Sequence, residues 1–103
     1  MTTSVFLNND RTMPLLGLGL YKITDNAEAE TAITAAVQNG YRLFDTASAY
    51  KNEEFVGHAL AKCGISRKDL FITTKIWNNA QRLGDVEGSL QRSLDRLGLD
   101  YID

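Results

Sequence analysis

Residues 40–57 read GYRLFDTASAYKNEEFVG, and this stretch decides the fold. It opens on Gly40 followed by an apolar residue, a pattern typical of the left-handed turn that ends a helix. The short apolar run Arg42–Asp45 is typical of a buried strand. Asn52 can cap a second helix, because the two glutamates that follow it suit the positive end of the helix dipole. The stretch therefore predicts a helix end, a strand and a second helix in succession.

The same glycine-apolar pattern ends three helical segments, at Asn39-Gly40-Tyr41, Cys63-Gly64-Ile65 and Leu97-Gly98-Leu99. Each segment has an apolar face with a period of about 3.6 residues, formed by Ala29, Ile33, Ala36 and Val37, by Val56, Ala59, Leu60 and Cys63, and by Val86, Leu90, Leu94 and Leu97. Asp25 can cap the first helix, with Glu28 as its capping-box partner, and Asp85 lies near the start of the third. Three amphipathic helices are therefore expected.

Four short apolar runs alternate with these helices: Leu15–Leu20, Arg42–Asp45, Phe71–Ile76 and Tyr101–Asp103. They are typical of buried parallel strands, and the markers Leu16, Leu43, Phe71 and Tyr101 follow one another at intervals of 27, 28 and 30 residues. A (β/α)₈ TIM barrel has about 31 residues per unit. The chain is therefore predicted to be α/β, the N-terminal part of such a barrel, with three βα units and the start of a fourth strand.

A β-hairpin is predicted before the first strand, because Val5–Leu7 and Arg11–Met13 flank the polar turn Asn8–Asp10. A doubly wound open sheet uses the same alternation of strands and helices and is the competing architecture. Its dinucleotide fingerprint needs a third glycine, but Lys22 follows Gly17 and Gly19 at that position. The pattern therefore favours the barrel over the open sheet.

The 103 residues suit one small domain, 1–103. Eleven basic and thirteen acidic residues give a net charge of -2, so no basic surface indicates nucleic acid as a partner. No apolar run is long enough to span a membrane, and no signal peptide is visible. Cys63 is the single cysteine and His58 the single histidine, so we expect a reducing, cytoplasmic compartment and no metal site.

The last run, Leu99–Asp103, is apolar and β-prone, and the chain ends where this strand begins. We therefore expect a partial barrel domain, truncated at the C-terminus. Half of a barrel exposes two sheet edges, and inner residues such as Leu43 would face water. The chain is consequently expected to self-associate through its open sheet edges.

Three polar residues lie at the predicted strand ends, where the chemistry of a βα barrel takes place. Asp45 ends the second strand, Tyr50 lies in the loop after it, and Lys75 lies near the end of the third. A free tyrosine has a pKa near ~10; a neighbouring ammonium favours the phenolate and lowers that pKa, and a carboxylate holds the ammonium in place. The three residues thus suit a general acid. A helix cap, a solvent-facing lysine and a packed aromatic are the structural alternatives.

Residues 40–57 resemble the signature of the aldo-keto reductase family at ten positions: Gly40, Tyr41, Arg42, Phe44, Asp45, Thr46, Ala47, Glu53, Val56 and Gly57. Met13–Gly19 is similar to the family's first strand and Phe71–Trp77 to its third. Ser89-Leu90 with Leu94–Asp103 is similar to its third helix and the start of its fourth strand. The resemblance covers essentially the whole chain.

The resemblance implies an NAD(P)H-dependent oxidoreductase that reduces small-molecule aldehydes or ketones to alcohols. It implies Tyr50 as the proton donor, Lys75 as the residue that lowers its pKa, and Asp45 as the partner of Lys75. NADPH is the expected cofactor, with NADH as the alternative. The residues expected near the nicotinamide are Gly19, Leu20, Tyr21 and Asp45. The residues expected to line the substrate pocket are Tyr21 and Trp77, for which plain packing is the alternative.

The family's remaining catalytic residue, a histidine, belongs to the strand that begins at Tyr101, and His58 in the second helix cannot replace it. Three hypotheses follow for the function of the chain. It comes from an oxidoreductase of this family, or it is a catalytically inactive N-terminal fragment of such an enzyme. The third hypothesis, a non-enzymatic module that binds a partner through its sheet edges, has no specific support in the sequence.

Overall fold

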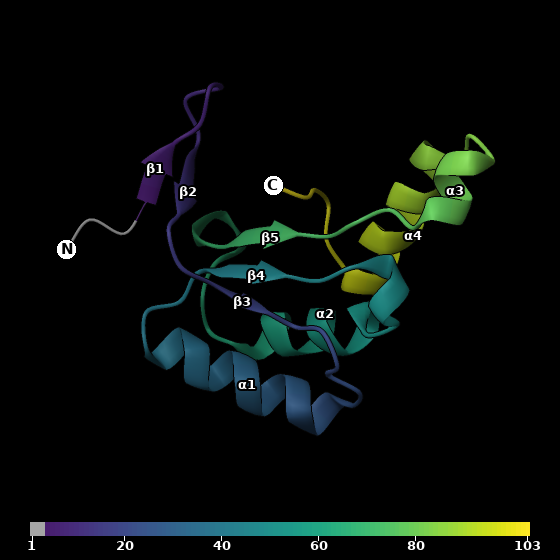
Figure 1. Ribbon diagram of the computed structural model, residues 1–103. Coiled ribbons are helices and arrows are strands. Elements are labelled where there is room, and N and C mark those ends of the chain that lie inside the picture. The colour runs from purple at the N-terminus through teal and green to yellow at the C-terminus, as the bar shows by residue number, and fades with distance from the viewer. Residues whose placement is uncertain (1–3) are drawn as a thin grey trace.

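The computed structural model describes residues 4–103, in which a small parallel sheet is covered by helices and preceded by a hairpin (Figure 1). The strands are β1 (Ser4–Phe6), β2 (Thr12–Pro14), β3 (Gly17–Gly19), β4 (Leu43–Asp45) and β5 (Phe71–Thr73). The helices are α1 (Asn26–Gln38), α2 (Glu53–Lys62), α3 (Asn78–Arg82) and α4 (Val86–Leu97), and single 3₁₀ turns cover Ser48–Tyr50 and Arg67–Asp69. No helix in this part of the chain is both long and apolar enough to cross a membrane.

Strands β3, β4 and β5 form a parallel sheet in that order. Gly17 pairs with Leu43 and Leu43 with Phe71, so the three strands are in register and all end at the same edge. Helices α1 and α2 cover one face of the sheet, and the carboxyl ends of the strands point toward α3 (Figure 1). The expected alternation of parallel strands and helices is therefore present.

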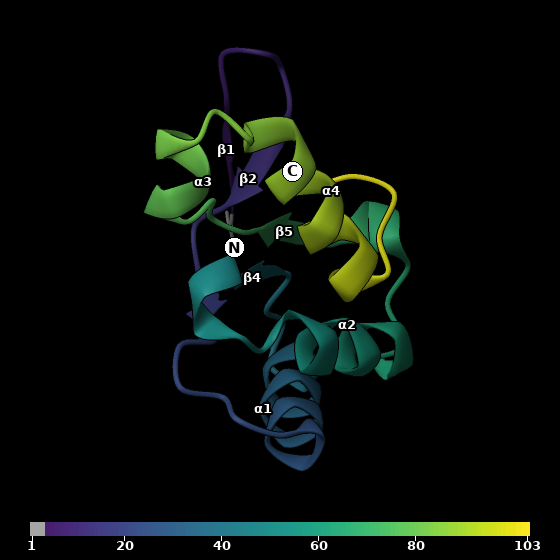
Figure 2. The same ribbon diagram turned by 90° about the vertical axis from the view of Figure 1, so that its right-hand side faces the viewer.

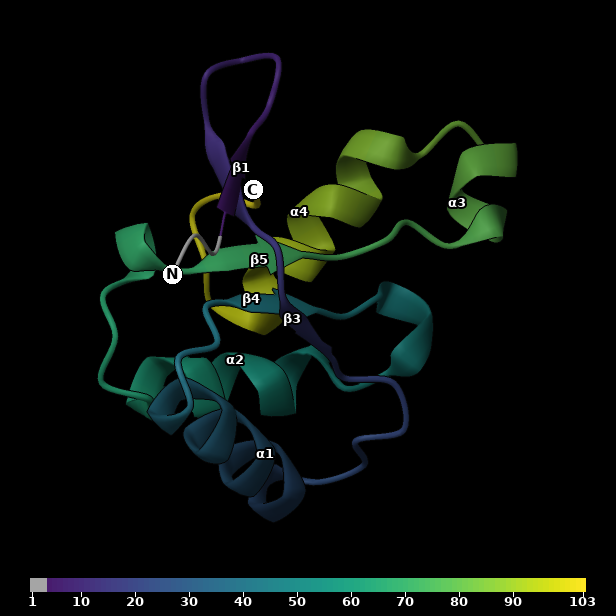
Figure 3. The same cartoon turned by 60° about the vertical axis from the view of Figure 1, so that its left-hand side comes forward.

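The predicted hairpin forms from β1 and β2, with Val5 opposite Met13. Asp10 adopts a left-handed conformation (φ 63°) in its turn, which a short polar side chain tolerates. The hairpin stands apart from the three-stranded sheet, near the end of the chain (Figure 3). An ion pair connects the hairpin to the end of the chain: the Arg11 guanidinium lies 3.3 Å from the Asp103 carboxylate.

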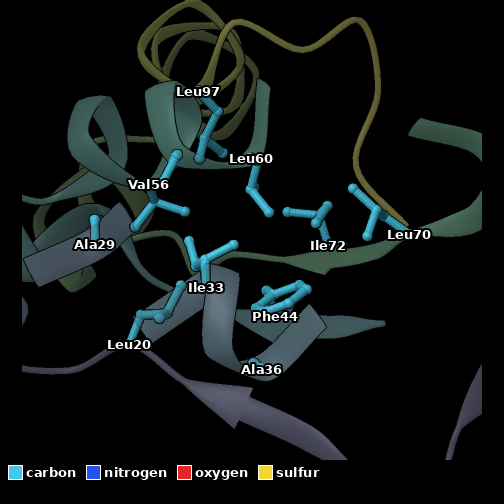
Figure 4. Close-up of a cluster of buried hydrophobic side chains, with 11 residues drawn as sticks. Leu20, Ala29, Ile33, Ala36, Phe44, Val56, Leu60, Leu70, Ile72 and Leu97 are labelled. Atoms are coloured by element: carbon cyan, nitrogen blue, oxygen red, sulfur yellow. The ribbon is translucent and has the colours of Figure 1, made fainter. Parts of the chain in front are cut away.

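The core lies between the sheet and the helices, where side chains from every layer meet (Figure 4). Phe44 and Ile72 of the sheet lie next to Ile33 of α1, with Val56 of α2 nearby, and all four are fully buried. Leu43, expected to face water, is instead buried at 8% exposure. The expectation failed because Gly17 leaves room on the neighbouring strand: a Cβ built there would overlap the Leu43 side chain, which lies across the glycine.

Helix α4 buries only part of the face that was predicted. Leu97 is buried and Leu94 half-buried as expected, whereas Val86 and Leu90 remain exposed and Ser89 and Ser93 are buried beside Leu97. The reason is the close approach of α4 to α2 (Figure 2), where a Cβ on Gly57 would collide with the Leu97 backbone. At such a short distance only small side chains fit between the helices, so serines occupy the contact.

The expected helix caps form only in part. Asp25 caps α1, accepting from the Glu28 N–H at 2.8 Å. Glu28 reaches the backbone N–H of Thr24 at 2.9 Å, one residue earlier than the capping-box prediction. Asn52 and Asp85 make no side-chain cap bond. The Asn52 side chain is turned into the protein, and Asp85 pairs with Arg92 at 2.8 Å.

Two segments differ from the expected elements. Residues 78–82, which belong to none of the predicted elements, form the short helix α3. Tyr101–Asp103 has no strand geometry, although the Asp103 N–H donates to the Ile72 carbonyl at 3.0 Å. The Asp103 carboxylate also accepts from the Ile72 N–H at 3.0 Å, which occupies the donor that a paired strand would use.

Candidate active site

The candidate site lies at the carboxyl ends of β4 and β5, where backbone pairing continues past the strands. The Thr46 N–H donates to the Thr73 carbonyl at 2.9 Å, and the Ser48 N–H donates to the Lys75 carbonyl at 3.1 Å. The Ser48 hydroxyl donates to the same Lys75 carbonyl at 3.0 Å. These bonds hold the segment after β5 beside the turn Ser48–Tyr50. The backbone thereby fixes Lys75 next to the residues that follow β4.

The structure brings Asp45, Tyr50 and Lys75 together around one ammonium group. The Lys75 Nζ lies 2.7 Å from Oδ2 of Asp45 and 3.3 Å from the Tyr50 hydroxyl. It also donates to the Thr46 carbonyl at 3.1 Å. The second oxygen of Asp45 accepts a hydrogen bond from the Thr73 hydroxyl. The carboxylate is held from both sides, so it orients the ammonium toward the phenol.

Charge interactions at this site act on Lys75. Burial alone would lower the pKa of its ammonium. The hydrogen bonds that the ammonium makes to Asp45 and Tyr50, and its electrostatic attraction to both groups, outweigh this effect. The pKa of Lys75 is therefore raised above its ordinary value of 10.5, and the side chain is a cation at neutral pH. The side chains of Lys75 and Asp45 are 52% and 34% exposed, so the pair remains open to solvent and to a ligand.

Of the other site residues predicted from the sequence, some lie close to this cluster and others do not. The Tyr21 ring lies 5.0 Å from the Tyr50 ring, centroid to centroid, and is largely exposed. Gly19 pairs with Asp45 in register, and a Cβ built on it would meet nothing within 4 Å, so open space lies beside the strand end. Leu20 is 1% exposed and its side chain belongs to the core, so the structure does not present it at the site. Trp77 is half-exposed at the start of α3.

Trp77 lines a groove of about 630 Å³ that runs between the turn Ser48–Tyr50 and the helices α3 and α4. Ser48, Ala49 and Lys51 form its opposite wall. The groove is adjacent to the site, but its lining does not include Asp45, Tyr50 or Lys75. Trp77 therefore lies beside the residues of the turn Ser48–Tyr50 and is not part of the cluster around the Lys75 ammonium.

Two buried polar residues near the site, Asn52 and Glu53, were not predicted from the sequence to be buried. Glu53 is 1% exposed and accepts from Arg96 Nε at 2.8 Å, Thr74 Oγ1 at 2.8 Å and Ser93 Oγ at 3.2 Å. Asn52, also 1% exposed, is bonded to three groups of its own. Both residues resemble ordinary helix-start residues in the sequence, and the partners of Glu53 lie 21 to 43 positions away.

Residues 15–103 match the model of the aldo/keto reductase family. The chain therefore belongs to the aldo/keto reductase family. An aldo-keto reductase of Mycolicibacterium vanbaalenii is 50% identical to it over 97% of this chain and 36% of that protein. The glyoxal reductase of Bacillus subtilis is 45% identical over the same shares. The chain thus spans about a third of the length of the curated relatives that it matches.

Solved structures agree with this assignment. An aldo/keto reductase of Brucella melitensis has a TM-score of 0.90 at 44% identity, over 100% of this chain and 39% of that one. An aldo-keto reductase from a deep-sea metagenome library has a TM-score of 0.89 at 45% identity, over 97% of this chain and 36% of that one. A Bombyx mori aldo-keto reductase in complex with NADP has a TM-score of 0.88 at 38% identity, over the same shares. The predicted fold, the N-terminal part of a (β/α)₈ barrel, is confirmed, and the open sheet is rejected.

Proposed function

We propose that this chain carries the proton-donating part of an NAD(P)H-dependent oxidoreductase site that reduces aldehydes or ketones to alcohols. The observation that supports the proposal is the Lys75 ammonium, which donates to the Asp45 carboxylate at 2.7 Å and to the Tyr50 hydroxyl at 3.3 Å. A phenol, an ammonium and a carboxylate in this order suit a general acid. Membership of the family supports the oxidoreductase class.

In the proposed reaction Tyr50 gives its hydroxyl proton to the carbonyl oxygen of the substrate as that oxygen gains negative charge. A reduced nicotinamide, when bound, would supply the hydride, and the proton from Tyr50 would complete the conversion of the carbonyl to an alcohol. The ammonium of Lys75 stabilises the phenolate that remains on Tyr50. Asp45 keeps the ammonium in place and offsets the loss of its hydration.

The residues at the strand ends suit a nicotinamide cofactor in part. Gly19 has no side chain and open space beside it, so a flat ring can approach the strand backbone closely. Tyr21 is exposed next to this space, and the Asp45 carboxylate is one-third exposed. Leu20 does not fit the expected role, because its side chain is buried and its N–H is bonded to the Asp45 carbonyl at 2.9 Å. We propose NADPH as the cofactor, with NADH as the alternative, since a 38% identical relative was solved with NADP.

The proposed substrate is a small-molecule aldehyde or ketone that lies over Tyr50. The Tyr21 ring, 65% exposed, presents a flat apolar surface 5.0 Å from the Tyr50 ring, and Trp77, 52% exposed, lines the neighbouring groove together with Ser48 and Ala49. One relative, 45% identical, is named a glyoxal reductase. Residues 4–103 contain no group of side chains that could hold a metal ion, and the proposed step needs none.

The experiment that tests the proposed function is a chimera. This chain replaces the matching segment of the Bacillus subtilis glyoxal reductase, to which it is 45% identical. We expect NADPH-dependent reduction of glyoxal by the chimera, because Asp45, Tyr50 and Lys75 would supply the proton. The unmodified reductase is the control for assay conditions. A chimera that folds and binds NADPH but does not reduce glyoxal would contradict the proposal.

We also propose that the 103-residue chain by itself does not turn over and self-associates. The outer edge of β3 has no partner strand among residues 4–103, whereas Asp103 occupies the outer edge of β5 at Ile72. An open edge of this kind favours pairing with another chain. NADPH oxidation in the presence of a reactive aldehyde tests the absence of turnover, and the molecular mass measured by light scattering tests self-association. A stable monomer of 11.4 kDa with clear turnover would contradict them.

A further inference from the structure

Two tight turns carry the tyrosines that face each other at the candidate site. Tyr21 and Lys22 lie in a turn closed by the Ile23 N–H, which donates to the Leu20 carbonyl at 3.2 Å. Tyr50 precedes Lys51 in a second turn, closed by the Lys51 N–H, which donates to the Ser48 carbonyl at 3.3 Å. Lys22 and Lys51 both adopt left-handed conformations, with φ of 70° and 58°. A side chain other than glycine is uncommon there, so both turns need support from outside.

A single buried side chain connects the two turns. The Asn52 amide nitrogen donates to the Leu20 carbonyl at 2.7 Å and to the Ile23 carbonyl at 3.3 Å, so it bridges both ends of the turn that carries Tyr21. Asn52 is itself the residue after Lys51, and therefore ends the turn that carries Tyr50. Its side chain is thus bonded to one turn while its backbone belongs to the other.

The same side chain also reaches the residue beside Asp45. The Asn52 amide oxygen accepts from the Thr46 hydroxyl at 2.6 Å, and the Thr46 side chain is fully buried. The carbonyl of Thr46 in turn accepts from the Lys75 ammonium at 3.1 Å. Asn52 is 1% exposed and three groups of the protein satisfy its amide. A buried amide with all its partners in place has one stable orientation, because any rotation leaves polar groups unpaired.

We propose that Asn52 is the positioning residue of the site: it sets the distance and angle between the Tyr21 and Tyr50 rings and holds Thr46 beneath Lys75. The inference rests on the proposed function, in which Tyr50 donates the proton and Tyr21 borders the cofactor and substrate. The rings lie 5.0 Å apart with 56° between their planes. Tyr21 is largely exposed and Tyr50 is half-buried, so the two turns, together with the Lys75 ammonium on the Tyr50 hydroxyl, fix this geometry.

A matched control separates positioning from stability. Glu53 is the next residue, equally buried, and its side chain bonds Ser93 and Arg96 of α4 and Thr74, which follows β5. It makes no bond to the turns that carry Tyr21 and Tyr50. A Glu53→Gln variant therefore weakens a buried network of similar size and leaves the support of the two turns intact.

The test uses NMR contacts between the aromatic rings in the chimera with the Bacillus subtilis glyoxal reductase, because the 103-residue chain by itself is proposed to self-associate. In the wild type we expect cross-relaxation between the Tyr21 and Tyr50 ring protons. In Asn52→Ala we expect this contact to disappear and the Lys75 side-chain resonances to shift, while the contacts among Phe44, Ile33 and Ile72 persist. In Glu53→Gln the inter-ring contact should remain. Persistence of the contact in Asn52→Ala, or equal loss in both variants, would overturn the proposal.

Hydrogen exchange of the wild type keeps the proposal testable if Asn52→Ala does not fold. The Ile23 and Lys51 N–H groups close the two turns and lie far apart in sequence. If Asn52 couples the turns, the two groups exchange through one opening, with the same free energy and denaturant dependence. Independent openings would overturn the proposal. None of these measurements needs turnover, so a failure of positioning is distinct from a failure of the proposed reduction.

Discussion

The polar side chains beyond β4 and β5 form two groups that differ in exposure more than in chemistry. Asp45, Tyr50 and Lys75 are partly exposed to solvent, whereas Thr46, Asn52 and Glu53 are buried. Strand alternation separates Asp45 from Thr46, because successive side chains point to opposite faces, and the turn after β4 brings Asn52 and Glu53 to the buried side. The partly exposed group is thus available for chemistry, and the buried group holds in place the loops that follow β4 and β5. Mutations should therefore affect stability on the buried side and chemistry on the exposed side.

The largest expected effect on stability is at Glu53. Glu53→Ala leaves the Arg96 guanidinium without the carboxylate that it contacts at 2.7 Å; because Arg96 is 34% exposed and can regain water, the cost is about 3 kcal/mol, the lower end for a buried pair. The free energy of unfolding in urea, followed by circular dichroism, measures this loss. Glu30→Ala is the matched control, because the Glu30–Lys62 pair is exposed and worth at most about 1 kcal/mol. Equal losses in the two variants would contradict the division into buried and exposed groups.

A smaller effect is expected where α2 and α4 touch. Gly57→Ala places a methyl group against the Leu97 backbone, which cannot move aside as a flexible side chain would. Overpacking of this kind costs about 1–3 kcal/mol. Gly19→Ala is the control, because its methyl group meets nothing within 4 Å. The same urea titration compares them, and a Gly19→Ala loss as large as that of Gly57→Ala would be evidence against the packing account.

The smallest effect on stability is expected at Lys75, on the exposed side. Lys75→Met should change the free energy of unfolding by less than about 1 kcal/mol at neutral pH, since the pair with Asp45 is partly hydrated. The folded-state pKa of Lys75 is raised, so its contribution is fully present below 10.5 and is lost as the pH rises through that higher value. Urea titrations of wild type and variant at neutral and strongly alkaline pH should therefore converge at the alkaline end. A difference in the free energy of unfolding between wild type and variant that grows as the pH rises would contradict this prediction.

Local patterns predicted α1 and α2 well, because both helices bury the face that their apolar residues define. Ala29, Ile33 and Ala36 are buried in α1, as are Val56 and Leu60 in α2. For α4 the apolar period was right at Leu97 but wrong at Val86 and Leu90, which are exposed. The contact with α2 is set by Gly57 and by the buried Glu53–Arg96 pair, which are distant in sequence. A helical period cannot report which neighbour the helix meets.

The candidate site was predictable in its exposed half and hidden in its buried half. Asp45, Tyr50 and Lys75 follow strand ends, so topology alone places them at one edge of the sheet. Asn52 was also predicted from its position in the sequence, but as a helix cap. In the structure its side-chain amide donates to the Leu20 and Ile23 carbonyls instead. Its backbone after Lys51 has φ of -125° and ψ of 7°, away from the extended conformation usual for a capping residue. That geometry depends on tertiary contacts that no local pattern contains.

The most direct test of the account is Tyr50→Phe in the chimera with the Bacillus subtilis glyoxal reductase. The variant lacks only the hydroxyl that lies 3.3 Å from the Lys75 ammonium. We expect kcat for glyoxal reduction to fall about 10²–10⁴-fold, the usual contribution of a general acid, while NADPH binding measured by fluorescence is unchanged. A loss of less than about tenfold would show that Tyr50 does not supply the proton. Loss of NADPH binding in parallel with turnover would equally contradict the account.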